Sequence, residues 1–364
     1  MNKETTNQIL LTDLNFKQIE ELVKSLGVYA YRAKQVAGWV YQRFAVSFDE
    51  MTDLPGAFRE ALAEKVSLQA LTSVREADSR DGTVKILFAL ADGETIESTL
   101  MPYPAPGGKM HYTICLSTQV GCPVSCAFCA TGQQGFVRNL TPGEIITQVL
   151  FFARRLHDTE PENSITNLVF MGMGEPLANY DNLLQAIEML NSPDGFGLGA
   201  RNMTVSTAGL VPQIKRLSKE KLQINLAVSL HASKDNLRNL LVPINNKYSL
   251  ELLIPACREY VAATSRRISF EYILFEGLND SLIQARALVH LVQGLNCHVN
   301  LIAANRTADA KYRPSSPEVV KAFEEELTRL HIVCTVRKGR GADIDAGCGQ
   351  LRSRHSTSSA SSLK

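Results

Sequence analysis

Long hydrophobic runs are missing from this sequence of 364 residues. No stretch approaches the roughly 18 consecutive apolar residues that a membrane-spanning helix needs, and the first residues lack the pattern of a signal peptide. We therefore expect a cytoplasmic protein with no membrane contact. The net charge of +1 is also too small for a uniformly basic surface, which argues against nucleic-acid binding through a general basic coat.

The charge is nevertheless distributed unevenly along the chain. Acidic residues outnumber basic ones in residues 1–100, whereas basic residues outnumber acidic ones in residues 201–270. A basic segment can contact phosphate groups, although a solvated surface is its more common meaning. With 45% hydrophobic and 21% charged residues, the composition is that of an ordinary globular protein. Charge alone therefore does not identify a partner.

The sequence contains eight cysteines, half of them between residues 115 and 129. In a cytoplasmic chain of this length they are not expected to form a disulfide framework. Their clustering indicates metal or redox chemistry instead. The cysteines are Cys115, Cys122, Cys126, Cys129, Cys257, Cys297, Cys334 and Cys348.

The N-terminal part of the chain is predicted to form a small helical module. Residues 16–26 and 32–46 carry apolar residues at helical spacing, and Pro55 precedes a third such stretch at residues 56–65. The module is followed by a polar stretch at residues 76–82, which we interpret as a connection to the next unit.

A β-hairpin is predicted next, from strands at residues 84–90 and 94–101 that are separated by Ala-Asp-Gly. Residues 102–108 are rich in proline and glycine and are expected to break regular structure. The chain is accordingly divided into a helical accessory domain at residues 1–75, a hairpin and linker at 76–108, and a larger core beyond them.

Strand-like and helical stretches alternate from residue 111 onwards. Residues 141–144, Thr-Pro-Gly-Glu, mark one helix start, because a capping threonine is followed by proline and, three residues after the cap, by glutamate. Such alternation predicts an α/β fold whose parallel sheet is covered by helices, either barrel-like or doubly wound. The predicted strands are residues 111–116, 165–171, 203–207, 224–230, 268–274, 298–304 and 332–337.

This core is expected to end at residue 352. Residues 353–364 form a polar tail of low complexity, which we expect to be disordered and to carry no chemistry.

The sharpest local signal is the C-x3-C-x2-C motif of Cys122, Cys126 and Cys129, directly after the first predicted core strand. Three thiolates on one short loop can converge on a soft metal centre. Structural zinc normally takes four protein ligands, whereas three thiolates on a four-iron cluster leave one iron open to a substrate. An iron–sulfur cluster is therefore favoured, with zinc as the alternative.

Other candidate ligand residues follow predicted strands. Residues 171–176, Met-Gly-Met-Gly-Glu-Pro, place Gly174 and Glu175 in a turn where backbone can approach a ligand and a carboxylate can accept hydrogen bonds from an ammonium group. Polar residues at the carboxyl ends of parallel strands tend to face the site of a barrel. Further candidates at strand ends are Ser206, the segment of Ser229, Leu230 and His231, and Asn305.

The cysteine motif resembles that of the radical S-adenosylmethionine (SAM) enzymes, which usually carry an aromatic residue where this chain has Phe128. The resemblance implies a [4Fe-4S] cluster whose open iron is chelated by SAM, inside a partial (β/α)6 barrel. It also implies that Gly174, Glu175, Ser206, residues 229–231 and Asn305 contact SAM. In such enzymes one electron cleaves SAM to a 5′-deoxyadenosyl radical.

Several longer motifs are similar to those of the RlmN family, radical SAM RNA methyltransferases that make 2-methyladenosine. The similarity covers essentially the whole chain, including the helical N-terminal module, and stops before the tail. The motifs are CLSTQVGC at residues 115–122, CATGQQGF at 129–136, RNLT at 138–141, MGMGEPLAN at 171–179 and DIDAGCGQL at 343–351.

The resemblance to RlmN assigns three further roles. Cys348 matches the cysteine that a first SAM methylates; the radical made from a second SAM then removes hydrogen from this methyl group, and the carbon radical adds to C2 of an adenine. Cys115 matches the resolving cysteine, which attacks the sulfur of Cys348 and releases the product as a transient disulfide forms. Glu97 matches the proton acceptor at C2.

The partners implied by the family are an adenosine in the peptidyl-transferase loop of 23S rRNA and, in many members, the adenosine 3′ to the tRNA anticodon. Recognition of folded RNA uses shape, phosphate contacts and unstacked bases. The helical accessory domain, Lys215 and Arg216 in the basic segment, and the basic residues at 337–340 are candidate contacts. The cluster also needs an electron donor such as flavodoxin or ferredoxin.

Three rival interpretations remain. A Cfr-type enzyme methylates C8 of the same rRNA adenine and shares every cysteine named above, although residues 133–136 and Pro176 look more like RlmN. A non-catalytic RNA-binding protein with structural zinc is a more distant alternative. A radical SAM enzyme with a small-molecule substrate would leave Cys115 and Cys348 unexplained.

Overall fold

A ten-stranded sheet forms the centre of the computed structural model, which describes residues 8–304, 312–337 and 339–344. Within these residues the strand order is β14-β13-β12-β11-β10-β9-β6-β5-β4-β3. The strands from β6 to β14 in this order run parallel to one another. They are β6 (Met110–Cys115), β9 (Ile165–Phe170), β10 (Met203–Thr207), β11 (Asn225–Ser229), β12 (Ile268–Leu274), β13 (Cys297–Ala303) and β14 (Cys334–Arg337).

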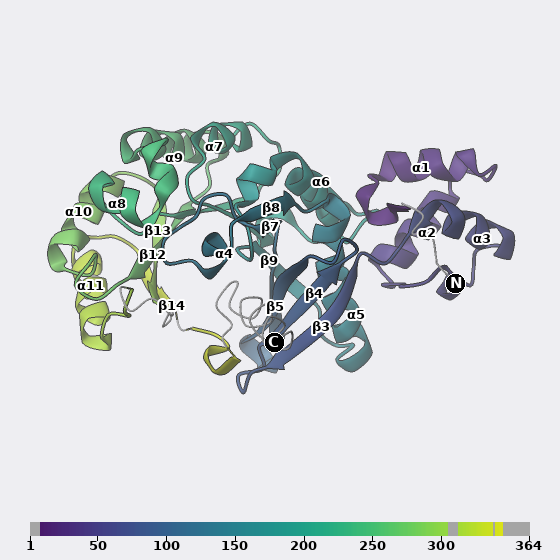
Figure 1. The fold of residues 1–364 in the computed structure, drawn as a ribbon, viewed down its shortest axis with the longest axis horizontal. Coiled ribbons are helices and arrows are strands. Elements are labelled where there is room, and N and C mark those ends of the chain that lie inside the picture. The colour runs from purple at the N-terminus through teal and green to yellow at the C-terminus, as the bar shows by residue number, and fades with distance from the viewer. Residues whose placement is uncertain (1–7, 305–311, 338, 345–364) are drawn as a thin grey trace, which may run out of the picture.

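Helices connect each parallel strand to the next and lie on the outer side of the curved sheet (Figure 1). This arrangement is the predicted α/β fold with a partial barrel: β6 and β9 to β13 supply the six strands of the predicted (β/α)6 unit, and β14 extends the sheet at its edge. The connecting helices are α5 (Pro142–Thr159), α6 (Tyr180–Asn191), α7 (Val211–Leu217), α8 (Asp235–Leu241), α9 (Leu250–Thr264), α10 (Leu282–Val292) and α11 (Pro317–Arg329).

Side chains alternate between the two faces of the sheet, and the two faces differ in chemistry. In β12, Phe270 and Tyr272 are fully buried, and the Tyr272 ring lies 5.5 Å from that of Phe323 on α11. Glu271, which lies between them, points the other way and is paired in register with Asn300 of β13. Because strand residues two apart share a face, the outer face is apolar and packs on the helices. The inner face, which we call the lumen face, carries polar side chains.

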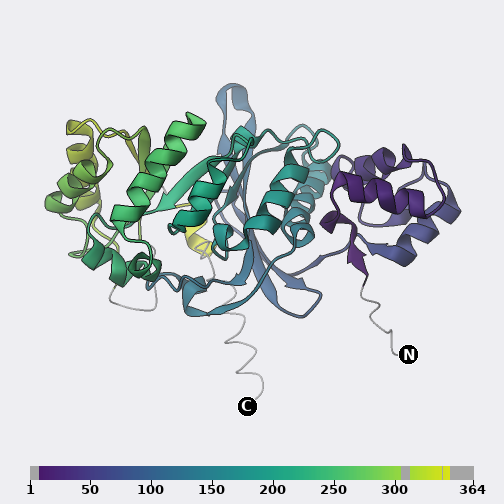
Figure 2. The ribbon, with the colours of Figure 1, turned by 90° about the horizontal axis from the view of Figure 1, so that it is seen from above.

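The helical N-terminal module lies at one end of the long axis of the molecule (Figure 2). It is joined to the barrel by one continuous set of buried apolar residues and by polar contacts. Asp13 accepts a hydrogen bond from the Gly143 amide (2.7 Å), and Glu50 pairs with Arg154 at 2.8 Å. The module comprises β1 (Ile9–Leu10), η1 (Leu11–Asp13), α1 (Phe16–Ser25), α2 (Arg32–Tyr41), η2 (Phe48–Glu50), α3 (Gly56–Lys65) and β2 (Val66–Ser67).

The predicted hairpin is present as β4 (Val84–Leu90) and β5 (Thr95–Pro104), but it belongs to a larger antiparallel extension of the sheet. β3 (Leu71–Asp78) pairs with β4 and overlaps the residues that were expected to form a polar connection. Most residues of β3 are exposed, so the strand has no hydrophobic alternation by which to recognise it. A bulge interrupts its register between Ser73 and Arg75.

The prediction that residues 102–108 break regular structure is wrong for residues 102–104. β5 continues to Pro104 and pairs with β6 over this stretch. Its pairing with β4 ends at Leu100, so Pro102 and Pro104 lie where β5 has a neighbour on one side only. Proline is tolerated at such edge-like positions because no ladder amide is required there.

No helix in the described part of the chain has both the length and the apolar character needed to cross a bilayer.

The capping box predicted at the start of α5 is confirmed. Thr141 Oγ1 accepts a hydrogen bond from the Glu144 amide (3.2 Å), and the Glu144 carboxylate accepts one from the Thr141 amide (2.9 Å). We expect Thr141→Ala to lower the free energy of unfolding by about 1 kcal/mol, because one amide at the helix start loses its acceptor. Urea denaturation followed by circular dichroism measures this, with Thr141→Ser as the control. An unchanged midpoint in the alanine variant contradicts the assignment.

Candidate active site

The three motif cysteines lie on a loop that is closed at its base. Cys122 follows β7 (Gln119–Gly121), which pairs with β8 (Phe136–Asn139), and the Cys122 amide donates to the Gly135 carbonyl at 2.9 Å. Gly121 has a φ of +75°, and a Cβ there would lie 1.9 Å from the Gly135 oxygen, so only glycine fits. The loop is thereby held in a compact turn before α4 (Ala130–Gln133).

The thiols of this loop lie close enough to influence one another. Burial is the main cause that raises the pKa of Cys122 to about 12, and the neighbouring Glu175 and Cys129 contribute to this shift. Burial also raises the pKa of Cys126 well above its ordinary value, with contributions from Cys129 and Cys122. Three neighbouring thiols, one buried and two half-buried, form a donor set that metal binding stabilises, because thiolates are the ligand form.

The three thiols are a donor set of the kind that iron–sulfur clusters use. Among the described residues, no group of three or more His, Cys, Asp or Glu side chains is arranged to hold one metal ion. The thiolates of a cuboidal iron–sulfur cluster bind separate irons, so they need not converge on one point. The chemistry of the three thiols therefore suits a [4Fe-4S] cluster.

The cysteine loop is seated on the carboxyl ends of the parallel strands. The Phe128 ring lies 5.0 Å from the His231 ring, which follows β11, and 5.4 Å from the Phe275 ring, which follows β12. Cys122 and Val124 are buried in the same apolar cluster. The structure thus brings the predicted metal ligands and the predicted strand-end residues to one end of the barrel.

Glu175 is buried between two strand ends, and its carboxylate accepts hydrogen bonds from backbone amides. Its carboxylate accepts hydrogen bonds from the Leu177 amide (3.1 Å) and the Ala208 amide (2.7 Å). Burial raises its pKa to about 7, and these hydrogen bonds oppose the shift. Gly174 has a φ of +110°, and a Cβ there would lie 2.7 Å from the Gln119 side chain. Both residues of the predicted ligand turn are therefore fixed by their surroundings.

The strand-end residues of β10 and β11 are likewise held by backbone contacts. Ser206 donates its hydroxyl to the Phe170 carbonyl at 2.8 Å. The amides of Leu230 and His231 donate to the Glu271 carbonyl, at 3.0 and 3.4 Å. His231 has a φ of +56°, and its Nδ1 accepts a hydrogen bond from the Ile273 amide (3.1 Å).

Arg238 on α8 organises these strand ends and was not found by sequence analysis. Its fully buried guanidinium donates to the carbonyls of Ala208 (2.6 Å), Ser229 (3.0 Å) and Leu230 (3.1 Å). Burial lowers its pKa to about 10, and the nearby Cys126 opposes this shift. No sequence signal marks Arg238, because its partners become visible only once the strands are assembled.

Glu97 and Cys115 lie apart from the cysteine loop, on the lumen face of the sheet. The Glu97 carboxylate forms an ion pair with Lys85 Nζ at 2.6 Å, and both side chains are buried. Burial raises the pKa of Cys115 to about 11, Lys85 and Arg337 lower it, and Glu97 raises it. Lys85 was missed by sequence analysis, although a single charge inside the apolar stretch 84–90 was the available signal.

Cys348 and Asn305 lie outside the described residues. The segment that leads towards Cys348 is described as far as η7 (Ala342–Ile344), and it is docked on the turn between β3 and β4. Asp343 accepts hydrogen bonds from Ser79 Oγ (2.5 Å) and the Arg80 amide (3.1 Å). This segment follows β14 and contacts the turn beside β3, so it bridges the two edge strands of the sheet.

The residues expected to contact RNA are engaged within the protein. Lys215 pairs with Glu259 at 2.9 Å, and Arg216 pairs with Asp181 at 2.7 Å. Arg340 lies over the Tyr103 ring at 4.6 Å. Exposed ion pairs of this kind are weak and exchange readily, so the assignment of RNA contacts stays a prediction.

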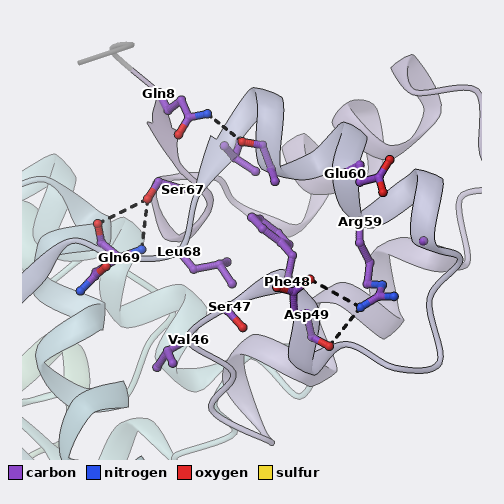
Figure 3. Close-up of a pocket in the computed structure, with 13 residues that line it drawn as sticks. Gln8, Val46, Ser47, Phe48, Asp49, Arg59, Glu60, Ser67, Leu68 and Gln69 are labelled. Carbon is purple, nitrogen blue, oxygen red and sulfur yellow. Dashed lines mark hydrogen bonds and ion pairs between the residues drawn. The ribbon is translucent and has the colours of Figure 1, made fainter. Parts of the chain in front are cut away.

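A cavity of about 370 Å³ lies in the N-terminal module, lined by residues of η2, α3 and β2 (Figure 3). Arg59 points towards Asp49 and donates to its carbonyl at 3.0 Å. None of the predicted catalytic, metal-binding or SAM-contacting residues lines this cavity. The candidate active site is therefore the end of the barrel and its lumen, where the reactive side chains gather.

Two family models match the chain. Residues 9–68 match the ribosomal RNA large subunit methyltransferase N-terminal domain, and residues 116–288 match the radical SAM superfamily. The boundaries agree with the helical module and with the part of the barrel that holds the cysteine loop.

Similar proteins extend the match to nearly the whole chain. A protein of Desulfitobacterium hafniense named probable dual-specificity RNA methyltransferase RlmN is 45% identical over 340 residues, covering 93% of this chain and 95% of that protein. A protein of the same name from Staphylococcus carnosus is 43% identical, covering 94% and 92%. The crystal structure of a radical SAM methyltransferase from Sphaerobacter thermophilus superposes with a TM-score of 0.90 at 47% identity, covering 94% of this chain and 98% of that one.

We expect His231 to remain neutral well below the ordinary histidine pKa of 6.5. Burial, and then the charge of Arg238, lower its pKa to about 3. Below pH 6.5 the unfolded chain therefore binds a proton at His231 that the folded chain does not. The free energy of unfolding consequently decreases as the pH falls from 6.5 towards 3.

Histidine-labelled protein followed by NMR between pH 7.5 and 5 tests this expectation. The His231 imidazole signal, identified by its absence in His231→Gln, should stay unchanged over this range. A His231 signal that titrates near 6 means that the imidazole is not buried beside Phe128.

Proposed function

The chain belongs to the RlmN family of radical SAM RNA methyltransferases, and from this premise we propose that it methylates C2 of an adenosine in the peptidyl-transferase loop of 23S rRNA. The adenosine 3′ to the anticodon of some tRNAs is proposed as a second substrate, in line with the dual specificity named for its relatives. The observation that carries the proposal is the gathering of the cysteine loop and strand-end residues at one end of a barrel whose lumen holds Glu97 and Cys115.

The cofactors of this proposal are a [4Fe-4S] cluster and SAM. Cys122, Cys126 and Cys129 would hold the cluster, which when bound supplies the electron that cleaves SAM to a 5′-deoxyadenosyl radical. The apolar residues around Phe128 exclude water from this end of the barrel. Flavodoxin or ferredoxin is proposed as the electron donor, and the cytoplasm as the compartment in which rRNA and tRNA are available.

The proposed SAM contacts are the residues at the strand ends. Gly174 and Glu175 follow β9, Ser206 ends β10, and residues 229–231 lie at the end of β11. Their backbone groups are fixed by Arg238 and by the Glu175 carboxylate, which leaves a preformed rim for a ligand. Asn305, the remaining proposed contact, follows β13 in the sequence.

Three residues are proposed to carry the methyl transfer. Adenine C2 is electron-poor, so it does not attack a SAM methyl group directly, and a carbon radical on the methylated Cys348 avoids this barrier. Glu97 accepts the proton from C2, and Cys115 attacks the sulfur of Cys348 to release the product with a transient disulfide. The buried ion pair with Lys85 keeps the Glu97 carboxylate in one position on the lumen face.

RNA recognition is proposed for the helical accessory domain at residues 1–75, with residues 76–108 as its connection to the core at 109–352. The module lies at one end of the long axis, where it extends the surface available to a folded RNA beyond the barrel itself (Figure 2). RNA of this kind is recognised through shape and backbone contacts spread over a wide surface.

The reaction is tested with anaerobically reconstituted enzyme, SAM, reductant and a 23S rRNA fragment, followed by nucleoside mass spectrometry. We expect 2-methyladenosine in the wild type and at least a hundredfold less in Cys348→Ala, because the methyl carrier is lost. Formation of 8-methyladenosine would assign the chain to Cfr-type chemistry. SAM cleavage without methylated RNA would contradict the proposed substrate.

Cluster binding is tested separately by iron analysis and by absorbance near 400 nm. We expect Cys126→Ala to lose most of its iron, because one of three ligands is missing, whereas Cys334→Ala, which changes a half-buried cysteine on β14, keeps it. Colourless wild-type protein that contains zinc after anaerobic preparation would support the zinc alternative instead.

A further inference from the structure

Lys85 and Cys115 lie on one line across three antiparallel strands. Lys85 is paired in register with Thr99 of β5, and Thr99 is paired with Cys115 of β6. Directly opposed residues of antiparallel strands share a face, and neighbouring strands lie about 4.8 Å apart. The two residues are therefore about two strand spacings apart on the lumen face, within the range of a lysine side chain. Glu97, two residues before Thr99, shares this face.

The Lys85–Glu97 ion pair is deeply buried. The exposed fractions of the two side chains are 1% and 3%, and the atoms Nζ and Oε2 are 2.6 Å apart. A buried ion pair gains little net stability, because both charges lose their hydration, and an apolar pair of similar volume is often as stable. On the opposite face of the same strands, Ile86 and Ile96 are fully buried apolar residues. The charges on the lumen face therefore call for a functional explanation.

Cys115 is surrounded by the charges that decide how readily it ionises. Burial raises the pKa of its thiol to about 11; Lys85 and, more weakly, Arg337 lower this pKa, whereas Glu97 raises it. The thiolate is the species that attacks sulfur, so a thiol with a raised pKa needs a nearby positive charge to react at neutral pH. Lys85 supplies this charge, but an ionised Glu97 at 2.6 Å largely compensates it.

We propose that Lys85 is a positioning residue that couples proton uptake by Glu97 to the activation of Cys115. When Glu97 accepts a proton it becomes neutral, and the ammonium group of Lys85 is left to stabilise the Cys115 thiolate. The resolving cysteine is thereby activated after the substrate has been deprotonated and not before. This inference rests on the proposed function, because it assumes the roles of Glu97 and Cys115 given above.

The resolving step itself is balanced. A bond forms between the sulfurs of Cys115 and Cys348, and the bond between the Cys348 sulfur and the methylene carbon on adenine breaks. The electron pair of the broken bond stays on carbon, which takes up one proton and becomes the methyl group. Two sulfurs are oxidised by two electrons in total, and the carbon is reduced by two. The proton taken up by carbon balances the one that Cys115 lost.

The inference is tested on the reconstituted enzyme without SAM, by alkylation with iodoacetamide between pH 6 and 10 and by peptide mass spectrometry of Cys115. We expect Lys85→Met to slow alkylation at pH 8 by roughly tenfold, because the pKa of the thiol rises when the positive charge is removed. Lys85→Arg should restore most of the rate. Glu97→Gln, which imitates the protonated carboxyl, should accelerate alkylation. The matched control is Lys109→Met, which removes an exposed lysine just before β6.

The double variant Lys85→Met/Glu97→Gln is the control for misfolding. It removes both buried charges together, so neither is left buried without its partner. Its alkylation rate should lie between those of the single variants, with an unchanged circular dichroism spectrum. Wild-type alkylation rates in folded Lys85→Met at every pH would overturn the inference.

Turnover with RNA provides an independent readout of the same residue. If resolution is slowed, Lys85→Met should accumulate a covalent protein–RNA adduct that survives denaturing electrophoresis, as Cys115→Ala should, while 5′-deoxyadenosine is still formed. Normal product release without adduct in the lysine variant contradicts the coupling. If the wild type methylates no RNA, the proposed function fails, whereas the alkylation experiment still reports the charge of Lys85 at Cys115.

Discussion

The two-residue alternation of side chains along one sheet determines where the chemistry of this protein is located. Residues such as Phe270 and Tyr272 fill the outer face and hold the helices, which leaves the intervening positions to face the lumen. Because this part of the sheet is buried on both faces, a polar side chain at a lumen position must find its partner inside. Glu271 with Asn300, at 2.7 Å, and Glu97 with Lys85 are the result.

A second constraint acts at the carboxyl ends of the strands. Backbone carbonyls and amides that leave a sheet lose their ladder partners, and each needs another one when it is buried. Arg238 satisfies the carbonyls, and the Glu175 carboxylate satisfies amides of two different connections. The cysteine loop packs on this completed rim through Phe128. The strand ends and the cysteine loop are therefore held together as one rigid unit.

Much of the fold was predictable because its signals are local. The strands at 203–207 and 268–274, the helix at 56–65 and the capping box of Thr141 were found with correct bounds, since each depends on residues that are neighbours in the chain. β3 was missed because its exposed side chains give no periodic signal. The three loop cysteines and the strand-end turns were found for the same local reason.

The parts of the site that were missed depend on contacts between distant residues. Arg238 reaches Ala208 across 30 positions, and Glu175 reaches the Ala208 amide across 33, so neither partner follows from the surrounding sequence. Lys85 is an isolated charge until β5 brings Glu97 beside it. The roles proposed for Cys348 and Asn305 rest on sequence resemblance, because both lie outside the described residues.

The irregular edge strand β3 has a consequence for the protein in concentrated solution. An open sheet exposes unpaired backbone groups at its edge, which are a template for the strands of other molecules and for fibril growth. The bulge after Ser73 shifts the register within β3, and its exposed residues include the charged Arg75, Glu76 and Asp78. A strand of a second copy that paired with β3 would lose its register at the bulge or bury these charged side chains. The sheet can thus end in an uncovered strand at β3 without recruiting other molecules through that edge.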